Sequence, residues 1–362
     1  MDAGKRRAND RLDIVAAASG FPAALNNVEN VKGRSDIAEM FKLLVAEIPE
    51  NAERDLSVEL DIFGPDIEVK RFAYHGDSEA LVAACADVDC VLTDFVPFDQ
   101  SVIEQLRKCR LISISATGFN FVDIEAAARH RISVCAIDEY CTNEVADHAM
   151  ALMLALSRNL MIYHQQVQQY HRWQFDSVTG LRRMDDLTLG IIGLGRIGRA
   201  VATRATGFGM KVIGHDPYSK NANVTLCDLD SLLGESDIIT LHCNVTPENH
   251  EFLDRRAFEI MSRKPILINV ARGALINEHD LVDALDRGLI RAAGLDVLAA
   301  ESPNLPASNL LGRNNVIITP HVAFYSDASM LENRTISASN IRHHLDGNHS
   351  AVRKYVHRAI EE

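Results

Sequence analysis

The stretch "LGIIGLGRIGRAV", Leu189 to Val201, decides the fold of this chain. An apolar run leads into Gly193-x-Gly195-x-x-Gly198, and a helical pattern follows. In a turn of this type the first glycine permits the bend, the second lets backbone N–H groups approach a pyrophosphate, and the third allows close helix packing. A strand before the turn and a helix after it separate the pattern from an ordinary glycine turn. The stretch therefore predicts a phosphate-cradling unit, although roughly half of the chain precedes it.

Composition and charge limit the class of protein. The chain has 362 residues, too many for one ordinary domain core, so two domains are expected. The hydrophobic fraction of 47% and the charged fraction of 24% are typical of a soluble globular protein. The formal net charge of -13 argues against a nucleic-acid partner, and Lys5, Arg6 and Arg7 are interpreted as a solvated tail.

Apolar runs and cysteines indicate the cellular setting. The longest apolar runs fall far short of the ~18 to 20 residues that span a bilayer, so no membrane association is expected. A basic start followed by a short apolar run, Ile14 to Ala18, only faintly resembles a signal peptide. The chain has 7 cysteines and no C-x-x-C pair, which argues against a disulfide framework and a zinc site. We therefore expect a cytoplasmic protein without a bound metal.

From Leu189 onward, short apolar runs alternate with amphipathic helical patterns. Continuous apolar strands need burial on both faces, as in a parallel sheet that is covered by helices on both sides. This pattern predicts the doubly wound α/β fold that binds dinucleotides. The strands are expected at 189–192, 211–215, 238–242, 266–270, 292–296 and 316–318.

The first half of the chain repeats the pattern on a smaller scale and predicts a second doubly wound parallel-sheet domain of the flavodoxin type. Its strands are expected at 12–16, 67–72, 89–93, 110–114 and 132–135, with helices near 78–85, 99–107 and 122–129. About fifty residues separate the first two strands, long for one crossover. We interpret part of residues 20–60, including a helical stretch at Ser35 to Ile48, as an insertion of unknown purpose.

Two helices are expected to connect the domains. A long helix begins at Thr142 or Asn143, either of which is a reasonable N-cap, and runs through "EVADHAMALMLALSRNL". A last helix, "SMLENRTISASNIRHHL", returns to the first domain. This organisation assigns residues 1–150 and 327–362 to a substrate domain, split by an inserted dinucleotide-binding domain at 151–326.

An acidic residue follows the second strand of the dinucleotide unit. Asp216 comes some twenty residues after Gly193, where a carboxylate accepts hydrogen bonds from the adenosine ribose. A 2′-phosphate there would meet a like charge, at a cost of about 1 to 4 kcal/mol. The sequence therefore favours NAD over NADP, with a simple turn at Asp216-Pro217 as the alternative.

Four polar residues lie just beyond the ends of the last three main strands. Arg272 follows the strand at 266–270, and its planar fork suits a substrate carboxylate. Asp296 and Glu301 follow the next strand, and His321 follows the last. Each residue taken alone has another interpretation. Arg272 could form a surface ion pair, Glu301 could be a solvated acid in a loop, and His321 could have a purely structural role. Together, after neighbouring parallel strands, they predict a hydride-transfer site beside a nicotinamide.

These motifs resemble the D-isomer-specific 2-hydroxyacid dehydrogenase family between Asp89 and Gly347. The resemblance is carried by "ATGFNFVDIEAA", "EVADHAMALMLALSR", "LGIIGLGRIGRAV", "LINVARGALINEHDLVDAL", "GLDV" and "TPHVAFYS". "LHCNVTPENHEF" and "TPHVAFYSDAS" are most similar to the C-terminal-binding-protein branch. In the family the substrate domain comes first, which accounts for the half of the chain before the glycine turn.

The resemblance implies a role for each matching residue. Arg272 would hold the carboxylate of a 2-oxo acid, His321 would act as general acid or base, and Glu301 would be its partner. Phe95 and Val96 lie in the loop that closes over substrate, and Gly118 is a further substrate contact, unless the loop at Thr117 and Gly118 is a simple turn. Asp296 would bind the nicotinamide carboxamide. The other implied NAD contacts are Thr117, Gly193, Gly195, Arg196, Ile197, Gly198, Asp216, Cys243, Thr246 and Val270, although Cys243 has the alternative of a small buried side chain.

Two functional hypotheses follow. The first is an NAD-dependent oxidoreductase that interconverts a 2-oxo acid and a D-2-hydroxy acid, and by analogy a homodimer formed through the cofactor domain. The second is an NAD(H)-sensing interaction protein of the corepressor type, with little or no turnover. The presence of Arg272, Glu301 and His321 favours the enzyme. The particular 2-hydroxy acid is left open.

Overall fold

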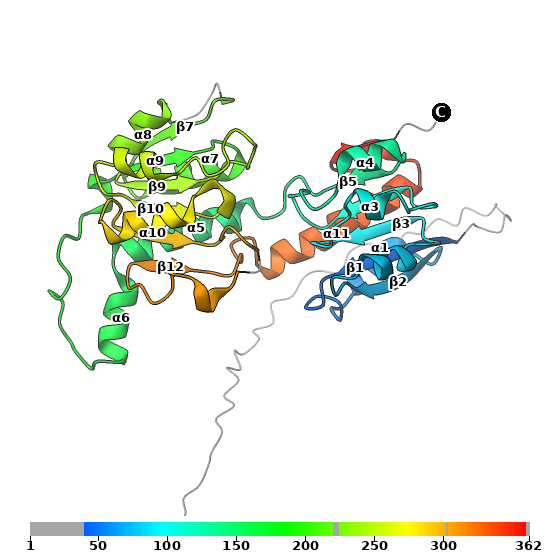
Figure 1. Ribbon diagram of the computed structural model, residues 1–362, viewed down its shortest axis with the longest axis horizontal. Coiled ribbons are helices and arrows are strands. Elements are labelled where there is room, and N and C mark those ends of the chain that lie inside the picture. Colours follow the sequence, from blue (N-terminus) through cyan, green and yellow to red (C-terminus); the bar gives the residue numbers. More distant parts are fainter. Residues whose placement is uncertain (1–39, 220–223, 302, 360–362) are drawn as a thin grey trace, which may run out of the picture. The chain divides into compact units, whose positions relative to one another are not determined.

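The computed structural model describes residues 40–219, 224–301 and 303–359, which form two mainly parallel β-sheets covered by helices (Figure 1). Within this described part the first sheet has six strands in the order β2-β1-β3-β4-β5-β13. Neighbours among β1 to β5 pair in parallel, while β13 is antiparallel to β5. The order 2-1-3-4-5 is that of the flavodoxin fold, as predicted. The strands are β1 (Phe41–Glu47), β2 (Ile67–Ala73), β3 (Cys90–Thr93), β4 (Leu111–Ile114), β5 (Ser133–Cys135) and β13 (Tyr355–His357).

Helices cover both faces of this sheet because successive strand residues point to opposite sides. Leu43 and Val45 of β1 join one core cluster with residues of α1 and α11, while Leu44 and Ala46 join the other. The second cluster contains residues of α2, α3 and α4. The helices are α1 (Ser57–Phe63), α2 (Ser78–Ala84), α3 (Gln100–Ile103), α4 (Ile124–Arg129) and α11 (Asp327–Leu345), and the short turn η4 (His349–Ala351) precedes β13.

The prediction of a helical insertion before residue 60 is wrong for the residues that the structure describes. Residues 41–47 form β1, an inner strand second from the edge of the sheet that pairs with both β2 and β3. Leu43 to Ala46 are all buried, and a four-residue apolar run of this kind has no period that separates strand from helix. Residues 57–63 form α1, an ordinary crossover to β2. The strand predicted at 12–16, Lys5 to Arg7 and Ile14 to Ala18 lie outside the described residues.

The second sheet has seven strands in the described residues, in the order β8-β7-β6-β9-β10-β11-β12, and all neighbours are parallel. In chain order this is 3-2-1-4-5-6 with one more strand at the edge, the order of the Rossmann fold. The six predicted strands are confirmed, and the two-residue β8 was missed. The strands are β6 (Thr188–Ile192), β7 (Lys211–His215), β8 (Thr225–Leu226), β9 (Ile238–Leu241), β10 (Ile266–Asn269), β11 (Ala292–Leu295) and β12 (Val316–Ile318).

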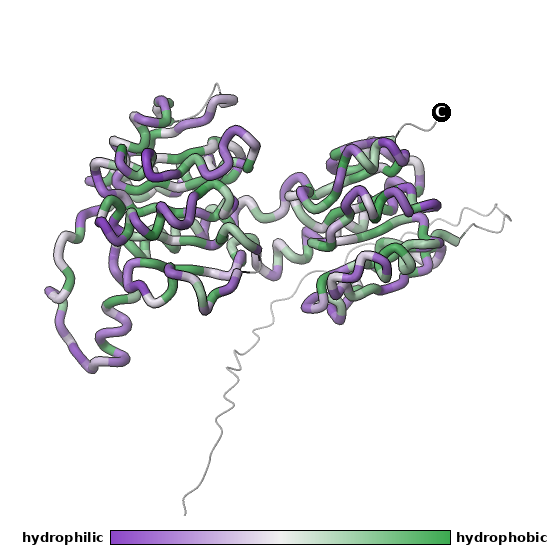
Figure 2. The backbone as a smooth tube through the Cα atoms, in the orientation of Figure 1, coloured by the Kyte–Doolittle hydropathy of each residue, from purple (hydrophilic) through white to green (hydrophobic). Residues whose placement is uncertain are grey.

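Two groups of helices bury the faces of the second sheet, whose apolar strands are green in Figure 2. One core cluster contains residues of α5 and α7, and the other contains residues of α8, α9 and α10. The helices are α5 (Thr142–Ser157), α6 (Leu160–Gln168), α7 (Arg196–Gly207), α8 (Leu229–Glu235), α9 (Arg255–Ile260) and α10 (Glu278–Asp286). Short 3-10 turns are η1 (Met184–Asp186), η2 (Gly273–Leu275) and η3 (Leu305–Ala307).

The predicted long helix is divided in two. Asn159 adopts a left-handed conformation with φ +50°, which asparagine tolerates better than most residues, and the chain turns there from α5 into α6. The N-cap of α5 is Cys141 rather than Thr142 or Asn143, and it makes no side-chain capping bond. The last helix, α11, begins just before the predicted stretch. Its N-cap, Ser326, forms a reciprocal capping box with Ser329.

Candidate active site

The glycine turn leaves open space at the N-terminus of α7. Gly193 has φ +93°, and a Cβ there would lie 2.6 Å from the backbone nitrogen of Cys243. A Cβ on Gly198 would lie 2.0 Å from the carbonyl oxygen of Gly193, so helix and turn touch backbone to backbone. At Gly195 a Cβ would meet nothing within 4 Å, and this N-cap offers no side chain to the first N–H groups of α7. These groups form a cradle that fits the pyrophosphate of a dinucleotide.

Asp216 lies against the same turn. Its carboxylate accepts the N–H of Leu194 at 2.8 Å, and the N–H groups of Tyr218 and Ser219 at 2.9 and 3.2 Å. The acid at the end of β7 is thereby fixed to the glycine turn. Because a carboxylate has about four acceptor positions, it keeps room for a ribose hydroxyl.

Arg272 follows β10 and is positioned by a buried asparagine. Asn269 is fully buried, and its amide donates to the carbonyl oxygen of Arg272 at 2.9 Å and accepts the N–H of Ala271 at 3.0 Å. Nη1 of Arg272 donates to the carbonyl oxygen of Ala271 at 2.7 Å. A Cβ built on Gly118 would lie 2.8 Å from Nη2 of Arg272. The loop after β4 therefore lies directly against the guanidinium, and a side chain at residue 118 would displace the guanidinium from this position.

His321 and Glu301 form the polar pair of the site. Nδ1 of His321 lies 2.8 Å from Oε2 of Glu301. The hydrogen bond from His321 holds the pKa of the Glu301 carboxyl below its usual value, and the charges of His321 and Arg272 act in the same direction. The structure thus brings the three predicted residues of the site within mutual electrostatic reach.

The backbone of His321 is held in an unusual conformation by Asp296. His321 has φ +51°, a left-handed value that is rare for a residue with a Cβ. Its N–H donates to the carbonyl oxygen of Asp296 at 2.8 Å. The carboxylate of Asp296, which is 1% exposed, accepts the N–H groups of Val322 and Ala323, both at 2.9 Å, and the hydroxyl of Thr319 at 2.5 Å. These bonds over-determine the turn that carries His321.

Several residues near the site were missed from the sequence. Nε2 of His148, on α5, lies 3.0 Å from the hydroxyl of Thr319 and 3.6 Å from Oδ1 of Asp296, the oxygen that accepts this hydroxyl. The ring of Phe324 meets that of His321 edge-on at 6.0 Å, and the ring of Tyr140 lies 6.5 Å from Phe324. Burial raises the pKa of Tyr140 and keeps its hydroxyl protonated. His148 and Phe324 lie within the quoted motifs "EVADHAMALMLALSR" and "TPHVAFYS", but the motifs assign them no role, and Tyr140 lies outside every motif.

The residues after β9 form one side of the glycine turn. Burial raises the pKa of the Cys243 thiol to about 11, so it is a protonated, half-buried side chain. The N–H of Thr246 donates to Oδ1 of Asn249 at 2.7 Å. His242, just before Cys243, is half-buried with its Nδ1 shielded from solvent, and burial lowers its pKa to about 3. Its Nε2 bonds to the hydroxyl of Thr240 at 2.9 Å, while its Nδ1 has no hydrogen-bond partner within the described chain.

The other predicted contact residues take different positions. Val270 is buried in the core of the second sheet, Ile197 packs against that core, and Arg196 pairs with Glu139 at 3.5 Å. In the loop after β3, Phe95 is 44% exposed, whereas Val96 is fully buried. Val96 therefore supports this loop from the core and does not line its surface. In the loop after β4, Thr117 is exposed.

Comparisons with known proteins agree with this geometry. The family model described as "D-isomer specific 2-hydroxyacid dehydrogenase, NAD binding domain" matches residues 150–323. A hydroxypyruvate reductase of Blautia hydrogenotrophica is 36% identical over 280 residues, which cover 75% of this chain and 86% of the relative. A glycerate dehydrogenase of Methylorubrum extorquens is 34% identical over 276 residues, 73% of this chain and 84% of the relative. The crystal structure of an Aquifex aeolicus D-lactate dehydrogenase with NAD and lactic acid matches with a TM-score of 0.78 and 26% identity, over 87% of this chain and 98% of that one.

A Rossmann sheet with an open glycine cradle and an arginine, a histidine and a carboxylate at its carboxyl edge defines a dinucleotide-dependent oxidoreductase. The chain belongs to the D-isomer-specific 2-hydroxyacid dehydrogenase family. It is an NAD-dependent enzyme that interconverts 2-oxo acids and 2-hydroxy acids. No helix in the ranges that the structure describes is long and apolar enough to cross a membrane.

Proposed function

We propose that Arg272, His321 and Glu301 carry out the reduction of a 2-oxo acid to the D-2-hydroxy acid and the reverse oxidation. The observation that carries this proposal is the 2.8 Å contact between His321 and Glu301 in the electrostatic reach of Arg272. Bound NADH supplies the hydride that the substrate carbonyl carbon accepts. The chain itself binds the carboxylate, orients the carbonyl and moves one proton.

Each residue has a distinct part in this mechanism. The fork of Arg272 donates two parallel hydrogen bonds to the substrate carboxylate. With Nδ1 of His321 bonded to Glu301, the proton for the carbonyl oxygen leaves from Nε2, and in oxidation the same nitrogen receives it. Glu301 stabilises the imidazolium and fixes its orientation. Gly118 would bring backbone donors to the substrate beside Arg272.

We propose a cofactor site around the glycine turn for NAD rather than NADP. The first-turn amides of α7, at Arg196, Ile197 and Gly198, would hold the pyrophosphate. Asp216 would accept from the ribose hydroxyls, and its charge opposes a 2′-phosphate. Asp296 would bind the carboxamide through its remaining acceptor capacity. The other proposed contacts are Thr117, Cys243, Thr246 and Val270.

Hydroxypyruvate is the substrate that we propose first, because the two curated relatives are named for hydroxypyruvate and for glycerate, an oxo acid and its reduced form. The test is steady-state kinetics with NADH on glyoxylate, hydroxypyruvate, pyruvate and longer apolar 2-oxo acids. The highest kcat/KM is expected for hydroxypyruvate. Inertness toward the whole panel together with no NADH binding would contradict the enzymatic function, whereas a better apolar substrate would contradict only the choice of hydroxypyruvate. The corepressor-type alternative is not favoured, since both curated relatives are named as enzymes.

The domain division is proposed from core packing. Val145 and Leu156 of α5 are buried in the core of the second sheet, and Ala338 and Ile341 of α11 in that of the first. We therefore place the cofactor domain from about the start of α5 to the end of β12, and the substrate domain on either side of it. Limited proteolysis that releases a fragment starting near residue 142 would support this boundary.

A homodimer formed through the cofactor domain is proposed from an exposed apolar segment. Side chains of α6 and the segment after it are unusually exposed, including Leu160 (54%), Met161 (55%), Tyr170 (59%), Trp173 (93%) and Phe175 (90%). Apolar groups gathered on one segment are expected to be covered by a second copy of the chain. Light scattering should give twice the chain mass, and the double substitution W173A/F175A should lower it toward the monomer. A monomeric wild-type protein at working concentration would contradict the dimer.

A cytoplasmic location is proposed from the cysteines. Those in the described residues are all free thiols, and Cys85, Cys90, Cys109 and Cys135 are buried in the substrate domain. Free thiols are typical of a reducing compartment. Cell fractionation tests the location, and recovery from a secreted fraction would contradict it.

A further inference from the structure

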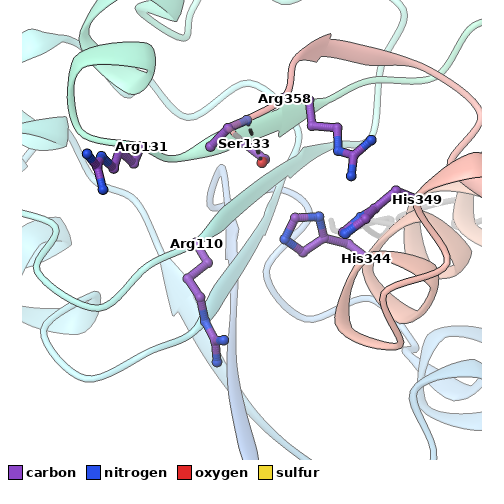
Figure 3. Close-up of a pocket in the computed structure, with 7 residues that line it drawn as sticks. Arg110, Arg131, Ser133, His344, His349 and Arg358 are labelled. Atoms are coloured by element: carbon purple, nitrogen blue, oxygen red, sulfur yellow. Dashed lines mark hydrogen bonds between the residues drawn. The ribbon is translucent and has the colours of Figure 1, made fainter. Parts of the chain in front are cut away.

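A basic hollow lies in the first sheet, apart from the residues discussed so far. It has a volume of about 490 Å³, and a smaller hollow of about 160 Å³ shares Arg110, His344 and His349 with it. Figure 3 shows its side chains around the ends of β4, β5 and β13 and the end of α11. The larger hollow is lined by Arg110, Arg131, Ser133, His344, His349, Arg358 and Ala359.

The topology separates this hollow from the proposed active site. Arg110 directly precedes β4 and Ser133 opens β5, so both lie at the amino ends of parallel strands. Arg358 follows β13, which is antiparallel to β5, and the N–H of Ala359 donates to the hydroxyl of Ser133 at 3.1 Å. Gly118 lies beyond the carboxyl end of β4, and a four-residue strand spans about 13 Å. The hollow is thus at the opposite edge of the sheet from the Arg272 contact.

The lining that the structure describes is basic, although the protein as a whole is acidic. The chain has a net charge of -13, yet the described lining contains three arginines, two histidines and no acidic residue. Arg110 is 3.3 Å from Asp89, but this carboxylate also receives Lys108 at 3.0 Å. One acid shared by two cations leaves positive charge at the rim of the hollow.

Tyr355 fixes the two imidazoles. Nδ1 of His344 and Nδ1 of His349 lie 2.9 and 3.0 Å from its hydroxyl oxygen, and the two rings are 5.2 Å apart. A hydroxyl has one proton, so it donates to one imidazole and accepts from the other. Burial raises the pKa of Tyr355 to about 12, so the phenol remains a donor. Arg358 lies over the Tyr355 ring at 5.8 Å, which gathers the guanidinium and both imidazoles on one tyrosine.

We propose that this basic hollow binds a small organic phosphate. Guanidinium groups recognise phosphate oxygens with paired hydrogen bonds, and imidazoles add single donors. A monocarboxylate has two acceptor oxygens and one negative charge, which is less than the donors and positive charges of the hollow can bind. A phosphate monoester has three acceptor oxygens and close to two negative charges, and so matches them better. The volume lies within the range of about 300 to 1,000 Å³ that is usual for ligand pockets, and the adjoining hollow adds Phe41 and Leu345 for an organic part.

The test is calorimetric titration of the full chain at about 0.15 M salt, where diffuse charge attraction is screened over roughly 8 Å. The probes are fructose 1,6-bisphosphate, glycerol 3-phosphate, inorganic phosphate and citrate. The protein is first saturated with NADH, so that the probes cannot bind at the dinucleotide site. Fructose 1,6-bisphosphate and glycerol 3-phosphate also lack the carboxylate of the proposed substrate, so they are not expected to bind as substrates. Saturable binding of an organic phosphate by the NADH-loaded protein is the expected result.

Variants locate the binding. Arg358→Gln and His349→Gln should each weaken the organic phosphate at least about tenfold, because each removes a charge-assisted or directed donor. Arg256→Gln, an exposed arginine on α9, is the matched control and should not change the affinity. Circular dichroism checks that the variants fold, and Arg110→Gln gives a second rim variant if one of them does not.

Three results would overturn the proposal: no saturable binding of either organic phosphate, binding that NADH abolishes, or equal affinity in Arg358→Gln, His349→Gln and wild type. Citrate binding more tightly than both organic phosphates would overturn the ligand class. NADH binding and turnover are measured separately from phosphate binding. A protein that binds no organic phosphate can therefore still be a dehydrogenase, and a protein without dehydrogenase activity can still bind an organic phosphate.

Discussion

His321 is bonded to Glu301 through Nδ1 at 2.8 Å, while the backbone of the same residue is held by Asp296, whose carbonyl accepts its N–H at 2.8 Å. Side chain and main chain are therefore fixed by two different acids. Asp296 is buried and Glu301 is 63% exposed in its side chain. The exposed acid can respond to substrate and solvent, whereas the buried acid holds the turn.

Replacement of His321 by glutamine should abolish most turnover. Glutamine carries no proton that can be transferred near neutral pH, so kcat for the best 2-oxo acid should fall by about 10² to 10⁴. The NADH dissociation constant, measured by fluorescence titration, should stay within a few-fold of wild type. A kcat within tenfold of wild type would show that another group moves the proton.

Glu301 acts through His321, and a double-substitution cycle tests this. E301Q should lower kcat by about 10 to 100-fold, because the imidazole loses its carboxylate partner. The double variant E301Q/H321Q should be no slower than H321Q alone, since two residues that act as one unit are not additive. Multiplied losses in the double variant would mean that Glu301 contacts substrate independently.

Arg272→Lys separates charge from shape. Lysine keeps the positive charge but lacks the planar fork, so kcat/KM should fall by about 10 to 150-fold, the equivalent of about 1.5 to 3 kcal/mol for a charged hydrogen bond. The control is Arg287→Lys at the C-terminal end of α10, where Arg287 pairs with Asp283 on the surface. This substitution should leave kcat/KM unchanged. An Arg272→Lys enzyme with wild-type kcat/KM would exclude carboxylate binding by this side chain.

Much of the second sheet was predictable because its strands are short apolar runs bounded by glycine, proline or polar turns. The inner strand β1 of the first sheet was not, since Leu43 to Ala46 form an unbroken apolar run without a period. In the site, residue types after strand ends indicated Arg272, Glu301 and His321. Packing partners from distant segments, such as His148 against Thr319, depend on the folded arrangement and leave no local pattern.

The basic hollow illustrates the same limit. Arg110, His344 and Arg358 come from separate parts of the chain and meet only because β13 returns antiparallel beside β5. No antiparallel strand after the last helix was expected from the sequence. A site assembled by an unexpected edge strand therefore exists only in the folded chain and has no counterpart in the local sequence.

Asp216→Gly should relax the choice of cofactor. Removal of the carboxylate removes the like charge that opposes a 2′-phosphate, so kcat/KM with NADPH should rise by about tenfold or more relative to NADH. The variant should also lose stability, because the N–H groups of Leu194, Tyr218 and Ser219 lose their acceptor. An unchanged ratio of NADPH to NADH activity would place the ribose away from Asp216.

The half-buried His242 predicts a specific dependence of stability on pH. Burial lowers its folded-state pKa from 6.5 to about 3, so the unfolded chain takes up the proton first as the pH falls. Stability from this residue is therefore complete above pH 6.5 and decreases toward about pH 3. His242→Gln, whose amide can still bond to Thr240, removes the titrating group.

Urea unfolding of wild type and His242→Gln at several pH values between 7 and 5 measures this effect as a difference, which cancels the titration of shared carboxylates. Below its unfolded pKa the wild type should lose about 1.4 kcal/mol of unfolding free energy per pH unit relative to the variant. His279→Gln, an exposed histidine on α10, should follow the wild type. Parallel pH curves for wild type and His242→Gln would mean that the imidazole takes up its proton in the folded state at the same pH as in the unfolded chain, against its burial beside the glycine turn.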